Sequence, residues 1–109
     1  MFLIAFGDSP VLRILDFFMV YEDLDYSMKQ IAKNAGVGYS TLKMFWPTLV
    51  ETGIMAHTRD VGNAKLYTLN LSSPAVKKFK KFYWEFTKQE AHKDLEKKGM
   101  VKKVVVKVR

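Results

Sequence analysis

Two short helical patterns separated by a glycine occupy the middle of the chain, between residues 27 and 53. Ser27 is followed three positions later by Gln30, the capping-box spacing in which each side chain bonds the other residue's backbone N–H. This spacing predicts a helix from about Met28 to Asn34. Gly36 then supplies a residue that easily adopts the backbone conformation of a tight turn. A second helical pattern begins directly after it.

The residues around this turn have the spacing of two helices that cross closely. Ala32 is followed four residues later by Gly36, six later by Leu42 and three later by Phe45. The small alanine lets the helices approach, while Leu42 and Phe45 hold the second helix to the core. The pattern therefore predicts a helix-turn-helix, which limits the possible folds more than any other feature of the sequence.

The second helical pattern, YSTLKMFWPTLVETG at residues 39 to 53, contains a proline that a helix interior normally excludes. Ser40 is a candidate cap, and Pro47 lies beyond the first turn after it. Because the proline ring displaces the hydrogen bond to the Lys43 carbonyl, we expect a straight segment from Ser40 to Phe45 and a bend near Trp46 and Pro47. The residues expected to face inward are Leu42, Phe45, Leu49 and either Trp46 or Val50.

The segments on either side of the motif predict a first helix and a β-hairpin. Ser9 and Pro10 are typical of a helix start, and the apolar stripe of VLRILDFFMVY predicts that this helix is buried. Residues 54 to 71 alternate with the period of strands on both sides of Gly62 and Asn63, which indicates a hairpin. The fold class is therefore α+β and mostly helical, with the hairpin as a wing beside the helix-turn-helix.

The C-terminal third predicts a long helix followed by a basic, valine-rich tail. Ser73 and Pro74 repeat the helix-start signal, and the pattern over residues 74 to 98 ends at Gly99. Few apolar residues lie in the second half of this helix, so we expect it to be exposed. The tail, residues 99 to 109, could follow DNA, pair as a strand with FLIAF near the N-terminus, or fray. Its β-branched residues favour strand pairing.

The chain has 109 residues, the length of one domain, and we expect its core over residues 8 to 73. Its net charge of +7 is unevenly distributed. The first 25 residues carry −4, residues 26 to 73 carry +3, and residues 74 to 109 carry +8. A basic balance of this size favours a polyanionic partner, and most of it belongs to the C-terminal third.

The composition argues against several classes of protein. With no cysteine and two isolated histidines, His57 and His92, the chain lacks a disulfide framework and a metal cluster, and we expect no cofactor. Neither histidine has a catalytic partner, and no glycine-rich phosphate loop or paired-carboxylate site is visible, so we expect no enzyme. The opening MFLIAF lacks the features of a signal peptide, and no apolar run reaches membrane-spanning length. We expect a cytoplasmic protein without membrane contact.

The order helix, helix-turn-helix, hairpin and long helix resembles the small archaeal winged helix-turn-helix transcriptional regulators. The resemblance covers roughly residues 6 to 86 and rests on FGDSPVLRILDFF, YSMKQIAKNAGVGYSTL and ETGIMAHTRDVGNAKLYTLN. It implies binding of double-stranded DNA and transcriptional control. In that family the second helix of the motif enters the major groove, and the wing contacts the adjacent backbone or minor groove.

Transferred to this chain, the resemblance places candidate DNA contacts on both elements of the motif and on the wing. Ser40 and Thr41 suit bases or phosphates, Lys43 suits guanine or phosphate, and Met44 suits a thymine methyl group. Three of these residues have a simpler structural alternative. Ser40 could act only as the helix cap, Lys43 could be a solvated surface lysine, and Met44 could contribute minor packing. The complete candidate set is Tyr39, Ser40, Thr41, Lys43, Met44, Thr48, Arg59, Asn63, Lys65, Lys29 and Lys33.

The long C-terminal helix carries candidate dimerisation residues. Its aromatic stripe could meet a second copy of the chain or pack on the chain's own first helix. Trp84 lies off the main stripe and favours a homodimer, which would read a palindromic site. The candidate set is Val76, Phe79, Phe82, Tyr83, Trp84 and Phe86. We therefore expect a dimeric, sequence-specific regulator, most simply a repressor; the alternative is a winged helix protein-interaction module or an accessory subunit of a transcription or replication complex.

Overall fold

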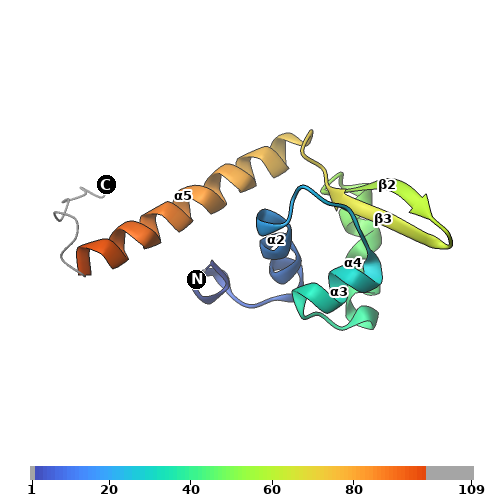
Figure 1. Cartoon of the computed structure of the whole chain (residues 1–109), viewed down its shortest axis with the longest axis horizontal. Coiled ribbons are helices and arrows are strands. Elements are labelled where there is room, and N and C mark those ends of the chain that lie inside the picture. The colour runs from blue at the N-terminus through green and yellow to red at the C-terminus, as the bar shows by residue number, and fades with distance from the viewer. Residues whose placement is uncertain (1, 98–109) are drawn as a thin grey trace.

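A computed structural model describes residues 2–97, and the basic tail predicted to pair as a strand lies outside them. Helix α1 (Phe2–Phe6) and helix α2 (Pro10–Val20) precede a short strand β1 (Tyr26–Ser27) and helices α3 (Met28–Ala35) and α4 (Tyr39–Glu51). Strands β2 (Met55–Val61) and β3 (Ala64–Leu69) then lead to helix α5 (Pro74–Lys97). Figure 1 shows α5 running away from a body formed by the other elements. The predicted α+β, mostly helical fold class is confirmed.

The helix starts expected from serine caps are present. Ser9 Oγ accepts from the Leu12 N–H at 3.2 Å, and the capping box joins Ser27 and Gln30 by bonds of 3.2 and 2.9 Å. Ser73 Oγ accepts from the N–H of Val76 at 3.3 Å, three residues into the next segment. Since each bond satisfies an N–H that the helix cannot, these starts depend on local sequence alone.

Helix α4 differs from the prediction at its start. The cap is Gly38 and not Ser40, and the helix start has no side-chain cap because glycine has no side chain. The helix continues through Pro47, which is exposed, and the predicted bend remains a prediction. Trp46 is the buried member of the pair left open with Val50, and Phe45 is half-buried.

The three strands form one antiparallel sheet in the order β1-β3-β2, which places β3 in the centre. The hairpin between β2 and β3 turns at Gly62 and Asn63, and Gly62 has a φ of 59°. The register shifts between His57 and Arg59, so Thr58 is an extra residue in β2.

One core joins all the helices to the sheet. Ile14, Phe18, Ile31 and Leu42 have no exposed surface, and Leu69 from the sheet is almost as fully enclosed. The other buried members of the cluster are Phe2, Phe17, Met19, Val37, Trp46, Leu49, Met55, Val76 and Tyr83. No helix within residues 2–97 is long and apolar enough to cross a membrane.

Helix α1 corrects a second expectation. FLIAF, considered as a strand partner for the tail, is helical and packs against α2 and α5. Phe2 is buried, and its ring centroid lies 5.0 Å from that of Tyr83 and 5.8 Å from that of Phe79. Because α5 offers Phe2 an aromatic surface, burial on a helix replaces the backbone pairing that the isolated sequence suggested.

Candidate nucleic-acid interface

The outer face of α4 carries the predicted contacts and is open to solvent. Leu42, Trp46 and Leu49 face the core, which turns the opposite side of the helix outward. Met44 is 83% exposed, a large value for an apolar side chain that the fold does not need. The remaining exposed predicted residues of the helix are Tyr39, Ser40, Thr41, Lys43 and Thr48.

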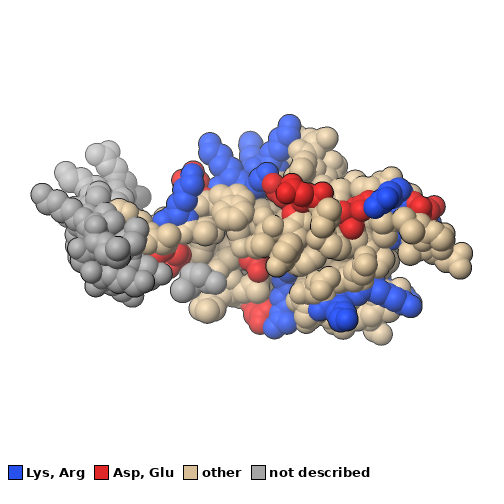
Figure 2. Space-filling model, in the orientation of Figure 1, with Lys and Arg blue, Asp and Glu red and all other residues tan. Residues whose placement is uncertain are grey.

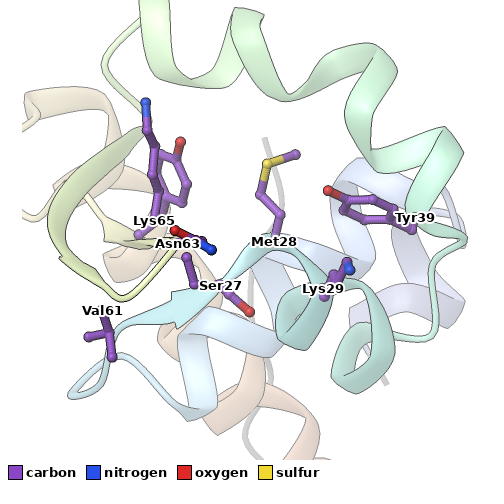
Figure 3. Close-up of a pocket in the computed structure, with 9 residues that line it drawn as sticks. Ser27, Met28, Lys29, Tyr39, Val61, Asn63 and Lys65 are labelled. Atoms are coloured by element: carbon purple, nitrogen blue, oxygen red, sulfur yellow. The ribbon is translucent and has the colours of Figure 1, made fainter.

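A cleft of about 630 Å³ separates the wing from α3 and α4 (Figure 3). Four of the predicted DNA contacts line it: Lys29 from α3, Tyr39 from α4, and Asn63 and Lys65 from the wing. The other lining residues, which the sequence did not single out as contacts, are Ser27, Met28, Val61, Ala64 and Tyr67. The fold thus brings residues 29 and 65 to one concave surface.

Two lysines lie close to the ring of Tyr39, which lines this cleft. The Nζ atom of Lys43 lies 5.3 Å from the centre of the Tyr39 ring, and that of Lys29 lies 5.9 Å from it. Both distances are typical of cation–π contacts, in which the negative face of the ring attracts the ammonium group. The ring therefore favours the presence of both positive charges at this place. Among the side chains of residues 2–93, none forms an ion pair with Lys29, Lys43 or Lys65.

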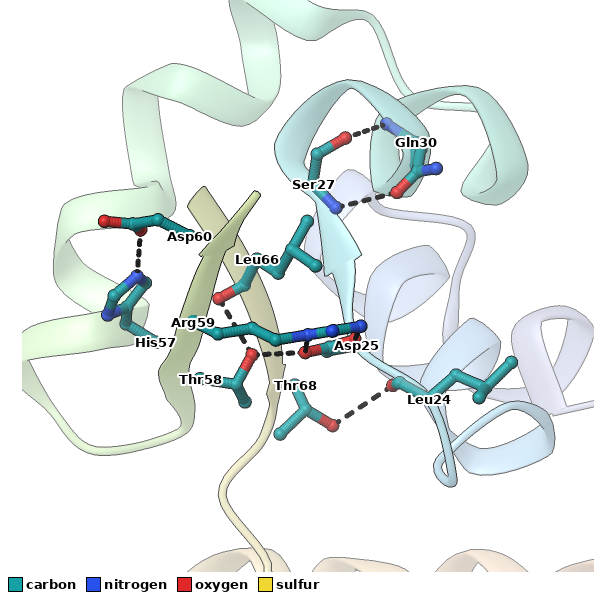
Figure 4. Close-up of polar contacts among 10 residues, drawn as sticks. All are labelled: Leu24, Asp25, Ser27, Gln30, His57, Thr58, Arg59, Asp60, Leu66 and Thr68. Carbon is teal, nitrogen blue, oxygen red and sulfur yellow. Dashed lines mark hydrogen bonds and ion pairs between the residues drawn. The ribbon is translucent and has the colours of Figure 1, made fainter. Parts of the chain in front are cut away.

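Arg59, a predicted wing contact, is engaged by the protein itself. Its Nε and Nη2 atoms donate to the Asp25 carboxylate at 3.0 and 3.2 Å, and the Thr58 hydroxyl donates to the same carboxylate at 2.5 Å (Figure 4). The Arg59 guanidinium, and then the Thr58 hydroxyl, lower the pKa of Asp25 below its ordinary value. The Thr68 hydroxyl donates to the Leu24 carbonyl at 3.4 Å, and so forms a third contact between the hairpin and the segment before β1.

Three other acidic residues of the first quarter of the chain also bind side chains of the protein itself. Asp8 binds the Arg13 guanidinium, Asp16 accepts from the Tyr83 hydroxyl at 2.6 Å, and Glu22 lies 2.7 Å from Lys80 Nζ. The Asp8 contact fixes the turn before α2 to that helix, whereas Asp16 and Glu22 connect α2 and the turn after it to α5. Of the local charge of −4, two charges are paired with cations from later in the chain, Glu22 with Lys80 and Asp25 with Arg59.

Arg13 supports the turn of the helix-turn-helix. Asp8 binds one edge of the Arg13 guanidinium, and the Nη1 atom of Arg13 donates to the Gly36 carbonyl at 2.9 Å. Gly36 has a φ of 71°, and its N–H bonds back to the carbonyls of α3. The sequence singled out Gly36 but not Arg13 or Asp25, because each acts on a residue more than 20 positions away.

The candidate dimerisation residues divide into two groups. Val76 and Tyr83 are buried against the body of the same chain, and Phe79 and Phe86 pack partly on that core. Phe82 and Trp84 are 46% and 38% exposed. Phe82 meets Phe6 of α1 edge to face, with a ring separation of 5.4 Å. The chain's own first helices thus occupy most of the stripe, and Phe82 and Trp84 remain accessible.

Lys33 and Thr48 are exposed but do not line the cleft. The described residues contain no group of three or more histidine or acidic side chains that could hold a metal ion.

A helix-turn-helix followed by a β-hairpin packed beside it defines a winged helix-turn-helix domain, and solved structures share this arrangement. The adhesin competence repressor AdcR from Streptococcus pyogenes superposes with a TM-score of 0.57 at 14% identity over 78% of this chain. Rv0081 from M. tuberculosis superposes with a TM-score of 0.54 at 21% identity, and the match covers 80% of this chain and 83% of Rv0081. Sso10a-2, a DNA-binding protein from Sulfolobus solfataricus, superposes with a TM-score of 0.52 at 9% identity, and the match covers 88% of this chain and 100% of Sso10a-2.

These likenesses establish the fold, since all the identities are low. The chain spans 65% of the length of the streptococcal repressor. No family model and no curated protein matches the sequence. Membership of an archaeal regulator family therefore stays a prediction.

Proposed function

We propose that the protein is a sequence-specific regulator of transcription that binds double-stranded DNA as a homodimer, most simply as a repressor in the cytoplasm. The observation that carries this proposal is the cleft between wing and helices, which Lys29 and Lys65 line from opposite sides, with Lys43 beside Tyr39. None of these three lysines forms an ion pair among residues 2–93. Phosphates are the natural counter-charges for such a surface. Two of the structurally similar proteins are described as a repressor and as a DNA-binding protein.

In this proposal α4 lies in the major groove and the wing follows the adjacent backbone. Ser40, Thr41, Lys43 and Met44 lie on the exposed side near the N-terminal end of α4, the end that reaches base edges most easily. The first turn of α4 has no side-chain cap at Gly38, so its N–H groups can receive a phosphate. Lys65 and Asn63 then contact the backbone from the wing, which Arg59 holds in place.

A homodimer would present two such surfaces to a palindromic site with half-sites about one helical turn apart. The accessible aromatic surface for this contact is Phe82 together with Phe6, whose ring lies 5.3 Å from that of Phe86. Ile4 of the same helix α1 is 81% exposed and adds to the accessible apolar surface.

The test is selection of bound duplexes from a random library, followed by fluorescence anisotropy on the selected site across a range of salt. We expect affinity to fall steeply with salt, and Lys43→Gln or Lys65→Gln to reduce the slope by about one each. Lys93→Gln is the matched control, because Lys93 lies on α5 beside Glu90, at 3.7 Å. Absence of binding at low salt, or equal effects of all three variants, would reject the proposal.

One observation favours the alternative of a protein-interaction module. Val20, Tyr21 and Leu24, at the end of α2 and after it, are each more than half exposed. Exposed apolar clusters often mark protein contacts. A stoichiometric protein partner retained by the wild type and lost in Tyr21→Ser, together with no retention on heparin, would support this function.

A further inference from the structure

We infer that the outer face of α5 is a second DNA-binding surface, which engages a different duplex from the one bound at α4. The inference rests on the proposed function and concerns a face that the cleft does not include. Lys77, Lys81, Trp84 and Lys88 follow one another at intervals of four, three and four residues. On a helix this spacing places them in one row, and we call the row the α5 ridge.

The α5 ridge is directed away from the protein core. Val76, Phe79 and Tyr83 lie on the opposite side of the helix, in the core cluster or against it. All four ridge residues are exposed, and the row extends roughly 16 Å at 1.5 Å per residue. Lys80 shows the contrast, because it turns toward the body and pairs with Glu22 at 2.7 Å.

The positive charge of the ridge is not balanced by the side chains of residues 2–93. Lys77 and Lys81 take part in no ion pair there, and Lys88 approaches only Glu85, at 3.9 Å and with both side chains largely exposed. Like charges four residues apart destabilise a helix. Two copies of the ridge would also repel each other, so this face is unsuited to pairing with itself. A polyanion removes both penalties by binding along the row.

Trp84 adds a second observation that points to a partner. Its side chain is 38% exposed among the lysines, with its ring 5.3 Å from that of Tyr83. Tryptophan is enriched where proteins bind partners, because its large ring gains from burial while its N–H can donate to a polar group. Here that acceptor would be a phosphate oxygen of the bound duplex.

The position of the ridge decides which duplex it can meet. Figure 2 shows basic side chains gathered along the upper edge over α5, and a separate basic group along the lower edge near α3. In Figure 1, α5 and α3 likewise lie at opposite sides of the molecule. A duplex seated against α3, α4 and the wing therefore lies away from the ridge. A second duplex can occupy it at the same time, which makes the protein a bridge between DNA segments.

A capture assay tests this inference. The selected duplex is immobilised, the full chain is bound to it, and a labelled duplex of unrelated sequence is added. We expect the wild type to retain the labelled duplex. Lys77→Gln/Lys81→Gln/Lys88→Gln should bind the immobilised duplex normally and retain at least about ten-fold less of the labelled one, since three phosphate contacts are lost. Glutamine is a good helix former, so these exposed positions should tolerate it, which a melting curve checks.

The matched control is Lys29→Gln/Lys43→Gln/Lys65→Gln, which loses the same charge from the cleft and from α4 and should fail to bind the immobilised duplex. Failure of the wild type to bind that duplex would reject the proposed function. Binding without capture of a second duplex would reject only the present inference. Capture of the labelled duplex by the ridge variant would also reject the present inference, because a dimer would then be bridging the two duplexes through its two α4 helices.

Two further results distinguish a second duplex on the ridge from an extended contact with the first duplex. If the ridge variant binds the first duplex more weakly, the ridge contacts the flank of that same duplex and the inference is wrong. Trp84 provides an independent readout, because the other tryptophan, Trp46, is only 3% exposed. Acrylamide should quench Trp84 in the complex with one duplex, and a second equivalent of DNA should protect it. Protection by the first equivalent alone would also contradict the inference.

Discussion

Asp25 accepts two hydrogen bonds from Arg59, at 3.0 Å from Nε and 3.2 Å from Nη2, across the width of the three-stranded sheet. Arg59 belongs to β2 at one edge, and Asp25 immediately precedes β1 at the other. A bidentate pair fixes direction as well as distance. The contact therefore links the wing to the helix-turn-helix, and in the proposed DNA complex we assign Arg59 a positioning role.

We predict that Arg59→Lys weakens DNA binding nearly as much as Arg59→Gln does. Lysine keeps the charge but cannot form two parallel bonds, so the wing loses its fixed orientation in both variants. The salt dependence of affinity should stay almost unchanged, because no phosphate contact is removed. Anisotropy titrations at several salt concentrations measure both quantities. If Arg59→Lys binds like the wild type while Arg59→Gln loses about one unit of slope, Arg59 contacts DNA directly.

The same pair predicts a dependence of stability on pH. Arg59, followed by Thr58, lowers the pKa of Asp25, so its ionised form favours the folded state. A group with a depressed folded pKa stabilises above its unfolded pKa of about 4 and loses this effect as the pH falls through the folded value. Melting temperatures of wild type and Asp25→Asn should therefore differ at pH 7 and converge toward about pH 2. A difference that persists unchanged under these acidic conditions would contradict this linkage.

Gly36→Ala should destabilise the helix-turn-helix by about 1–2 kcal/mol, because its φ of 71° is unfavourable for a residue with a Cβ atom. The added Cβ would also lie 2.9 Å from Arg13 Nη1, which has to move. Urea denaturation measures the loss. Gly62→Ala is the control, because it has a φ of 59° but no atom within 4 Å of the added group. Equal losses in both variants would show that displacement of Arg13 has no effect on stability.

Pro47→Ala should raise the free energy of unfolding and leave DNA affinity unchanged. Pro47 is exposed within α4, and alanine restores a backbone N–H that can bond the Lys43 carbonyl, a change that favours helices by up to about 3 kcal/mol. Urea denaturation and anisotropy on the selected duplex provide the two measurements. A loss of affinity without a loss of stability would show instead that the proline aims the N-terminal half of α4.

The elements of this fold were predictable where short-range chemistry specifies them. The capping box of Ser27 and Gln30 and the signal at Ser9 and Pro10 each act within a few residues, so the sequence shows them directly. The start of α4 was not predictable in the same way. Ser40 is as good a cap as Ser27 by type, but the turn already places Gly38 at the cap position.

By itself, the sequence determined the order of α2, α3, α4, β2, β3 and α5, the winged helix-turn-helix class and the outward direction of Lys43 and Met44. These follow from caps, periodicity and glycine positions, which are local properties of a chain. Only the tertiary structure decided that FLIAF is a helix on α5, and that Asp25 engages Arg59. Both depend on surfaces that form only after distant segments have packed, so no local pattern could reveal them.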